Sequence, residues 1–73
     1  MKWHDNTKEP RNFTGVVCVL IDRTIIRGVY SHADKGIELP TGAYVDLSNV
    51  FGWAHASEVD AAILADFDQR KAR

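Results

Sequence analysis

The side chains that could bind a metal are scattered along this sequence. His4, His32 and His55 fall in three separate segments, and no CxxC or HExxH pair accompanies them. Zinc sites are recognised from closely spaced pairs of histidine and cysteine ligands. The spacing therefore predicts no metal site and no cofactor, and we expect the histidines at surfaces or strand ends.

Side chains for nucleophilic or acid–base catalysis are equally poorly placed. Cys18 lies inside the apolar run VVCVLI, whereas a catalytic thiol must be accessible and ionised, so we expect a buried structural thiol. The ten acidic residues offer carboxylate pairs by chance, and Asp22 and Asp34 occupy turn positions. The five glycines are too far apart for a phosphate-binding loop. We therefore expect a protein that is not an enzyme.

One stretch, VFGWAHASEVD at residues 50–60, sets a tryptophan and a histidine just ahead of a helix start. A large aromatic beside an incoming helix is usually a core residue. We expect Trp53 to pack under the C-terminal helix with Ile63 or Phe67, and His55 to lie at the junction of strand and helix without a metal.

Length and charge limit the classes of function. Seventy-three residues, 45% hydrophobic and 26% charged, are typical of one small globular domain of marginal stability. The net charge of −1 gives no overall electrostatic reason to bind nucleic acid. A single cysteine favours a reducing cytoplasm, and a polar N-terminus without an apolar run of about 20 residues favours neither export nor a membrane.

Hydrophobic patterning predicts the elements that position these residues. Residues 1–12 read as an extended arm anchored by Trp3. The run at 13–21 predicts a strand covered on both faces, joined by a hairpin across Asp22-Arg23 to a second strand at 24–32. In that second strand, Tyr30 belongs to the core face and Ile25 to a mixed face. Gly36 is placed for a turn with positive φ, and residues 39–42 for a type I turn.

Two more strands and a helix complete the expected fold. The strands are at 43–47 and 50–54, the latter with Phe51 and Trp53 on the same side. Ser57 is the predicted N-cap of a helix that ends near residue 71. The helix is expected to pack an apolar stripe on the sheet, formed by Val59, Ala62, Ile63 and Phe67. The fold class is thus α+β, a single domain with a three- to four-stranded antiparallel sheet and one C-terminal helix packed on it.

Large side chains without a core role are the candidates for binding a partner. By elimination these are Trp3, Arg11, Arg27 and Tyr44, residue types that contribute strongly at protein contacts. Such a surface would also let the chain form a homodimer. Nucleic-acid binding is the less favoured alternative, with Tyr30 or Trp53 as a stacking partner for a basic set of Arg11, Arg23, Arg27, Arg70, Lys71 and Arg73.

Several residues together carry a family resemblance. Trp3, Pro10, Gly15-Val16-Val17 leading into Val19-Leu20, Gly28-Val29-Tyr30 and Gly52-Trp53-Ala54 resemble the W…P…VLV…G-Y…W layout of short phage and prophage proteins in the domain-of-unknown-function family 551. That family has no established activity, so the resemblance assigns no catalytic residue. It implies a small accessory protein of a phage or mobile element.

The sequence therefore predicts a non-catalytic protein of the host bacterial cytoplasm. We expect it to bind a bacterial host protein, for example to inhibit a defence system such as CRISPR. The first alternative is a small-ligand or nucleotide binder, which would show a closed pocket with convergent polar groups. The second is a nucleic-acid binder, which would show steep salt dependence.

Overall fold

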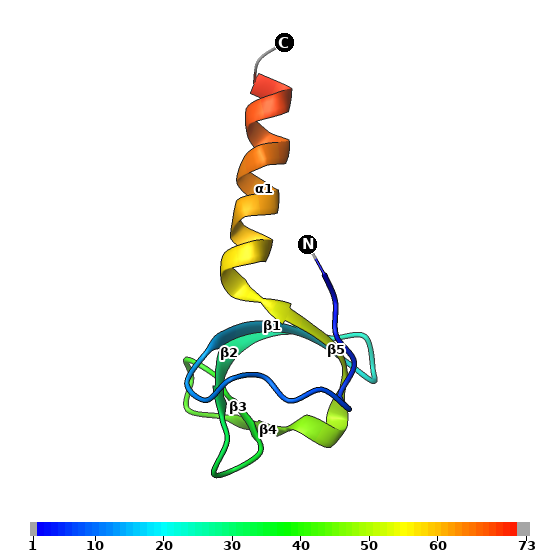
Figure 1. The fold of residues 1–73 in the computed structure, drawn as a ribbon, viewed down its shortest axis with the longest axis vertical. Helices are drawn as coiled ribbons and strands as arrows, with labels where there is room; N and C mark the ends of the chain where they lie inside the picture. The colour runs from blue at the N-terminus through cyan, green and yellow to red at the C-terminus, as the bar shows by residue number, and fades with distance from the viewer. Residues whose placement is uncertain (1, 72–73) are drawn as a thin grey trace.

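The computed structural model of the chain describes residues 2–71, so Arg73 of the predicted basic set, and the side chain of Lys71, lie outside the described part. Figure 1 shows a strongly curled antiparallel sheet with one helix rising from it. The sheet has five strands in the order β4-β3-β2-β1-β5. They are β1 (Gly15–Leu20), β2 (Ile25–Ser31), β3 (Gly36–Glu38), β4 (Tyr44–Asp46) and β5 (Val50–His55), and the helix is α1 (Ala56–Lys71). The predicted α+β class is confirmed, with one strand more than expected.

The concave side of the curled sheet holds the core. Its buried members are Val16, Cys18, Tyr30, Ile37, Val50 and Trp53. The predicted division of β2 is confirmed, since Tyr30 is fully buried while Ile25 on the opposite, outer face is 70% exposed. The predicted hairpin is also present, because the amide of Leu20 donates to the carbonyl of Thr24 at 2.8 Å.

The strand that the sequence did not predict, β3, lies where a turn was expected. It has only three residues, and its first residue, Gly36, does not take the predicted positive φ; Lys35 does, at 51°. Gly36 is needed for a different reason, because a Cβ there would lie 2.6 Å from the ring of Tyr44. At Gly28 a Cβ would lie 2.4 Å from the carbonyl oxygen of Glu38. Both glycines thus let neighbouring strands approach.

The N-terminal arm runs across the open side of the curled sheet (Figure 1). His4 pairs with Trp53 through two backbone hydrogen bonds of 2.8 Å, and Pro10 is buried. The predicted anchor, Trp3, is instead 45% exposed. The arm therefore closes the core through its backbone and Pro10, which the polar sequence did not indicate.

A β-bulge in β5 corrects the predicted position of Phe51. Val19 is opposite Gly52 and Leu20 is opposite Val50, so Phe51 has no partner in β1. The extra residue breaks the alternation of sides. Trp53 points into the core, whereas Phe51 lies outside it and is 57% exposed.

The helix differs most from the prediction. It begins at Ala56, directly after β5, so Ser57 lies inside the first turn and does not precede the helix as a cap. Its first turn contacts the outer face, where Ala56 lies next to Gly15 and Arg27 binds Asp60. From residue 61 to residue 70 every side chain is exposed.

The helix therefore projects from the sheet and gives the molecule a length of 45 Å against a width of 20 Å (Figure 1). The expected packing of Ile63 and Phe67 on the sheet, and of Trp53 beneath them, is wrong. Trp53 points to the concave side of the sheet, and the helix leaves from the convex side.

Candidate functional site

Three aromatic rings meet where the arm crosses β5. The ring of His4 stacks on Trp53 at 4.5 Å between centroids, and His55 approaches Trp53 edge-on at 5.2 Å. The indole Nε1 of Trp53 donates to the carbonyl of Lys8 at 2.9 Å. Desolvation and the nearby positive charge of Lys8 lower the pKa of His4. A neutral His4 stacked on a buried indole fastens the arm, which agrees with the predicted anchoring role of Trp53 although the packing partner is different.

A second fastening point of the arm is Glu9. The hydroxyl of Tyr30 donates to Glu9 Oε1 at 2.6 Å, and His32 Nδ1 contacts the same oxygen. The hydrogen bond from Tyr30 lowers the pKa of Glu9, while burial and that carboxylate raise the pKa of Tyr30. Both large aromatic side chains of the core therefore hydrogen-bond to the arm.

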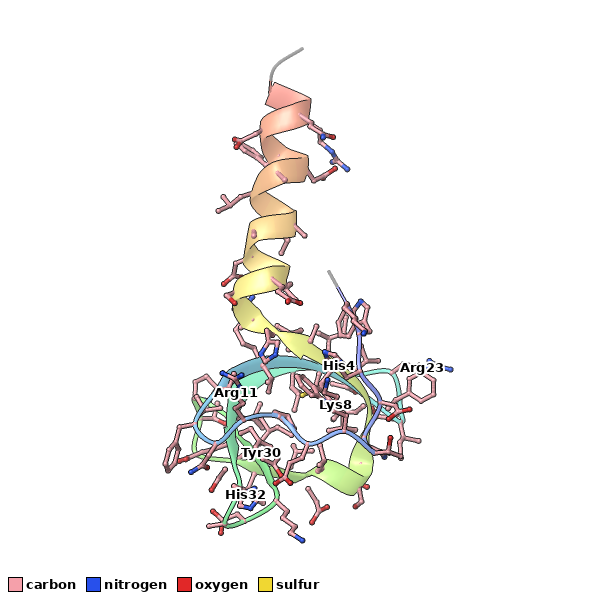
Figure 2. The ribbon with its side chains drawn as sticks, viewed as in Figure 1. His4, Lys8, Arg11, Arg23, Tyr30 and His32 are labelled. Carbon is pink, nitrogen blue, oxygen red and sulfur yellow. The ribbon has the colours of Figure 1, made fainter. Side chains whose placement is uncertain are left out.

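Between these two points the arm and the sheet edge enclose an open hollow. This arm hollow is lined by Lys8, Glu9, Arg11, Thr14, Trp53 and His55. Figure 2 shows His4 and Lys8 near the middle of the sheet's open side and Arg11 at one edge of it. Two cationic side chains, an imidazole and a hydroxyl are groups that bind anions, whereas the carboxylate of Glu9 in the same lining repels them.

The structure brings no three metal-ligating side chains together among residues 2–71. His4 and His55 are neighbours, with ring centroids 6.3 Å apart, whereas His32 lies toward the opposite end of the sheet (Figure 2). Cys18 is buried, and desolvation raises the pKa of its thiol to about 11. A thiol that stays protonated near neutral pH is a poor nucleophile.

The four residues predicted to bind a partner do not form one surface. Trp3 and Arg27 are associated with the outer face, but both terminal nitrogens of the Arg27 guanidinium, Nη1 and Nη2, donate to Asp60, the closer at 2.7 Å. Arg11 belongs to the arm hollow. Tyr44 is half-exposed on β4, the edge strand at the other side of the sheet.

The predicted basic set is also dispersed. Arg27 is paired with Asp60, and Arg70 with Asp66 at 3.1 Å. Arg11 and Arg23 lie at opposite sides of the curled sheet in Figure 2. Nucleic-acid binders normally gather such charges into one stripe or patch, which the described members of this set do not form.

A different group of exposed and half-buried residues does form a continuous surface. Trp3, Val19, Arg23, Phe51 and Gly52 line one hollow on the outer face, and Ile25 lies directly opposite Val19 in the β1–β2 pair. We call these six residues the outer-face patch. The guanidinium carbon of Arg23 lies 4.6 Å from the centre of the Phe51 ring. Gly52 has no side chain, so only its backbone lines the hollow.

Two local features create this patch, and the sequence reveals neither clearly. The β-bulge turns Phe51 outward, and Arg23 takes a φ of 74° at the hairpin turn, where glycine or asparagine is more common. A bulky residue in this conformation is a signal of local strain or function. The apolar runs at residues 13–21 and 50–54 do not indicate that one strand has an extra residue, so the bulge could not be predicted from them.

No family model, curated protein or solved structure matches the chain. The resemblance to the phage family 551 therefore stays a prediction. Within the described residues, no helix has the length and apolar character needed to cross a membrane.

Proposed function

We propose that this chain acts by binding a protein and that the outer-face patch is its contact surface. The observation that carries the proposal is the exposure of Trp3 and Phe51, 45% and 57%, around a hollow that Gly52 also lines. Exposed aromatics beside an arginine are the residue types that dominate binding energy at protein interfaces. Two rigid rings lose little side-chain entropy on binding.

The arginine of the patch supports the same function. Arg23 is stacked on Phe51 in a turn conformation that costs free energy for any residue with a Cβ. The stacking holds the guanidinium in place before a partner arrives, so its hydrogen-bond donors require less ordering on binding.

The partner class we propose is a bacterial host protein, with a component of a defence system as the first to be tested. This choice rests on the sequence resemblance to small phage proteins. The chain would inhibit such a host protein by covering part of its surface, which requires no catalytic group. The place of action would be the host cytoplasm, where the buried Cys18 would remain reduced.

Paired capture experiments test the proposal. Tagged wild-type chain and a Trp3→Ala/Phe51→Ala variant are exposed to the same bacterial lysate, and retained proteins are identified by mass spectrometry. We expect a protein that the wild type retains and the variant loses. Phe13→Ala is the matched control, because Phe13 is also an exposed aromatic but lies outside the patch. Identical retention by all three proteins would contradict the proposal.

The arm hollow supports a second candidate function, the binding of a small anion or a nucleotide. Lys8 and Arg11 provide charge, and Thr14 and His55 provide hydrogen-bonding groups. Titration calorimetry with phosphate and with ATP tests it. Binding that is lost in Arg11→Ala and kept in Arg23→Ala would favour this candidate, and absence of heat with both ligands would eliminate it.

A further inference from the structure

The two edges of the sheet are covered differently. At the β5 edge, the arm pairs with Trp53 through the backbone of His4. At the other edge, β4 pairs only with β3 among the described strands, and in Figure 1 it lies at the lower end of the curled sheet, away from the helix. The N–H and C=O groups of an unpaired edge can bind another extended chain. A further strand can therefore be added at β4.

The ladder between β3 and β4 identifies the groups that face outward. The amide of Leu39 donates to the carbonyl of Ala43 at 2.9 Å. Bonded residues alternate along an antiparallel pair, so Val45 also bonds to β3, whereas Tyr44 and Asp46 direct their backbone groups away from it. Within residues 2–71, no backbone group pairs with the amide or carbonyl of Tyr44 or with the amide of Asp46.

This outward edge of β4 lines an open hollow of about 420 Å³. The opposite wall consists of Leu20, Ile21, Asp22 and Asn49, and we call the space between the two walls the β4 seam. Leu20 packs against the core, and Ile21 is 62% exposed. An apolar wall thus lies beside the free backbone groups, where a side chain of an added strand would be placed.

The charged side chains of the β4 seam are both acidic. Asp22 and Asp46 lie on opposite walls, and none of the described residues that line the seam is basic. The backbone amide of Thr24 donates to Asp22 and that of Ser48 to Asp46, and these hydrogen bonds lower the pKa of both carboxyl groups. The two carboxylates are therefore charged near neutral pH and favour a partner with basic side chains.

We propose that the β4 seam binds an extended segment of a partner protein, added antiparallel to β4, in which one apolar residue stands between two basic residues. An antiparallel neighbour satisfies both outward groups of Tyr44 with a single residue, so it suits an edge as short as this one. Addition of a strand to an exposed edge is a common way of binding peptides.

The alternation of side chains gives the sequence pattern of this segment. Val45 lies opposite Ile37, which is buried in the core. The residue of the segment opposite Val45 therefore points to the same concave side, toward Leu20, and is apolar. Its two neighbours point to the side of Tyr44 and Asp46 and are basic. The seam shares no residue with the outer-face patch, so this inference does not depend on the function proposed above.

Titration of the isotope-labelled chain with short peptides, followed by nuclear magnetic resonance, tests the proposal. The probe is a blocked peptide Thr-Arg-Val-Arg-Thr, and its control is Thr-Glu-Val-Glu-Thr. We expect the first peptide to shift the amide signals of Tyr44 and Asp46 in a saturable way, and the second to leave them unchanged. No shift of these two signals at millimolar peptide would overturn the proposal, as would shifts confined to Trp3 and Phe51.

Conservative variants test the role of charge. Asp22→Asn/Asp46→Asn keeps an acceptor for the amides of Thr24 and Ser48 and removes both charges, so we expect the dissociation constant of the arginine peptide to rise about tenfold. Asp5→Asn/Asp68→Asn removes the same charge outside the seam and should change it little. Equal weakening by the two double variants would overturn the assigned charge complementarity.

A modified peptide tests the backbone pairing. Methylation of the backbone nitrogen of the second arginine, which lies opposite Tyr44, removes the donor to the Tyr44 carbonyl and should weaken binding about tenfold. Methylation of the nitrogen of the valine, which faces away from β4, should have little effect. Equal affinity of the two methylated peptides would overturn the addition of a strand at β4.

Discussion

At the scale of single residues, the buried indole of Trp53 has two roles. It fills the core, and its Nε1 holds the carbonyl of Lys8. Truncation removes both roles, whereas phenylalanine retains most of the volume and loses only the hydrogen bond. The effects of the two substitutions can therefore be separated.

We expect Trp53→Ala to lower the free energy of unfolding by about 3–5 kcal/mol, the usual loss for a large buried aromatic. Trp53→Phe should cost about 1–3 kcal/mol, because the Lys8 carbonyl loses its donor. Urea unfolding followed by far-ultraviolet circular dichroism measures both. Equal stability of Trp53→Ala and wild type would show that the indole does not support the core.

Glu9 gives the fold a dependence on acid. Its pKa is lower in the folded chain than in the unfolded chain because Tyr30 donates to it, so its contribution to stability is complete above the unfolded pKa and is lost as pH falls through the folded value. We expect the stability difference between wild type and Glu9→Gln to shrink once the pH falls below the unfolded pKa of a glutamate, about 4.3, and to vanish only below the lower pKa of the folded chain. Urea midpoints at a series of pH values measure this difference. A constant difference would exclude the carboxylate charge as its source.

A substitution at Arg23 can distinguish an effect on stability from an effect on partner binding. Glycine accepts a positive φ without strain, so the substitution stabilises the turn by about 1 kcal/mol. It also removes the cation–π contact with Phe51, which costs about 0.5–1 kcal/mol at an exposed site. We therefore expect Arg23→Gly to leave the free energy of unfolding within about 1 kcal/mol of wild type. The same variant should retain less of the partner that depends on Trp3 and Phe51. Unchanged retention would remove Arg23 from the contact surface.

At the scale of elements, β2 and β3 can pair because Gly28 of β2 has no side chain at the point where the strands come close. A Cβ at Gly28 would lie 2.4 Å from the carbonyl oxygen of Glu38, whereas one at Gly15 would make an ordinary contact of 3.6 Å with Ala56. We expect Gly28→Ala to destabilise by about 1–3 kcal/mol or more and Gly15→Ala to have a much smaller effect. Thermal unfolding measures the loss of stability in each variant. Equal losses would show that β2 and β3 can move apart to make room for a Cβ at Gly28.

The elements also show how far the sequence could be read. Alternation identified the two sides of β2, and the apolar run of residues 13–21 identified β1, because period-two patterns report burial directly. Phe51 was placed inside because a bulge is invisible to that pattern. The predicted apolar stripe of α1, which includes Ile63 and Phe67, was assigned to the sheet, since the spacing of apolar residues does not show what covers them. The extended arm was predicted, but its docking through His4 in place of Trp3 was missed, because backbone pairing at His4 leaves no hydrophobic signal.

At the scale of the whole molecule, the projecting helix is separable from the sheet. Side chains from residue 61 to residue 70 are exposed, while Asp60 still binds Arg27. A chain ended after residue 62 should therefore keep the urea midpoint of the sheet, followed by tryptophan fluorescence in dilute solution. A large loss of stability in the dilute truncated chain would mean that the outer turns of the helix support the sheet directly.

The pairing of His4 with Trp53 joins residues 49 positions apart in the chain. During synthesis on the ribosome, the arm is made before β5, so the core remains open on one side until β5, which ends at His55, has emerged. Contacts between distant positions slow folding, because a long loop must close before they form. A bulky addition fused closely to the N-terminus would interfere at this last closing step, whereas an addition at the free end of α1 would not, which makes the C-terminus the better position for an affinity tag.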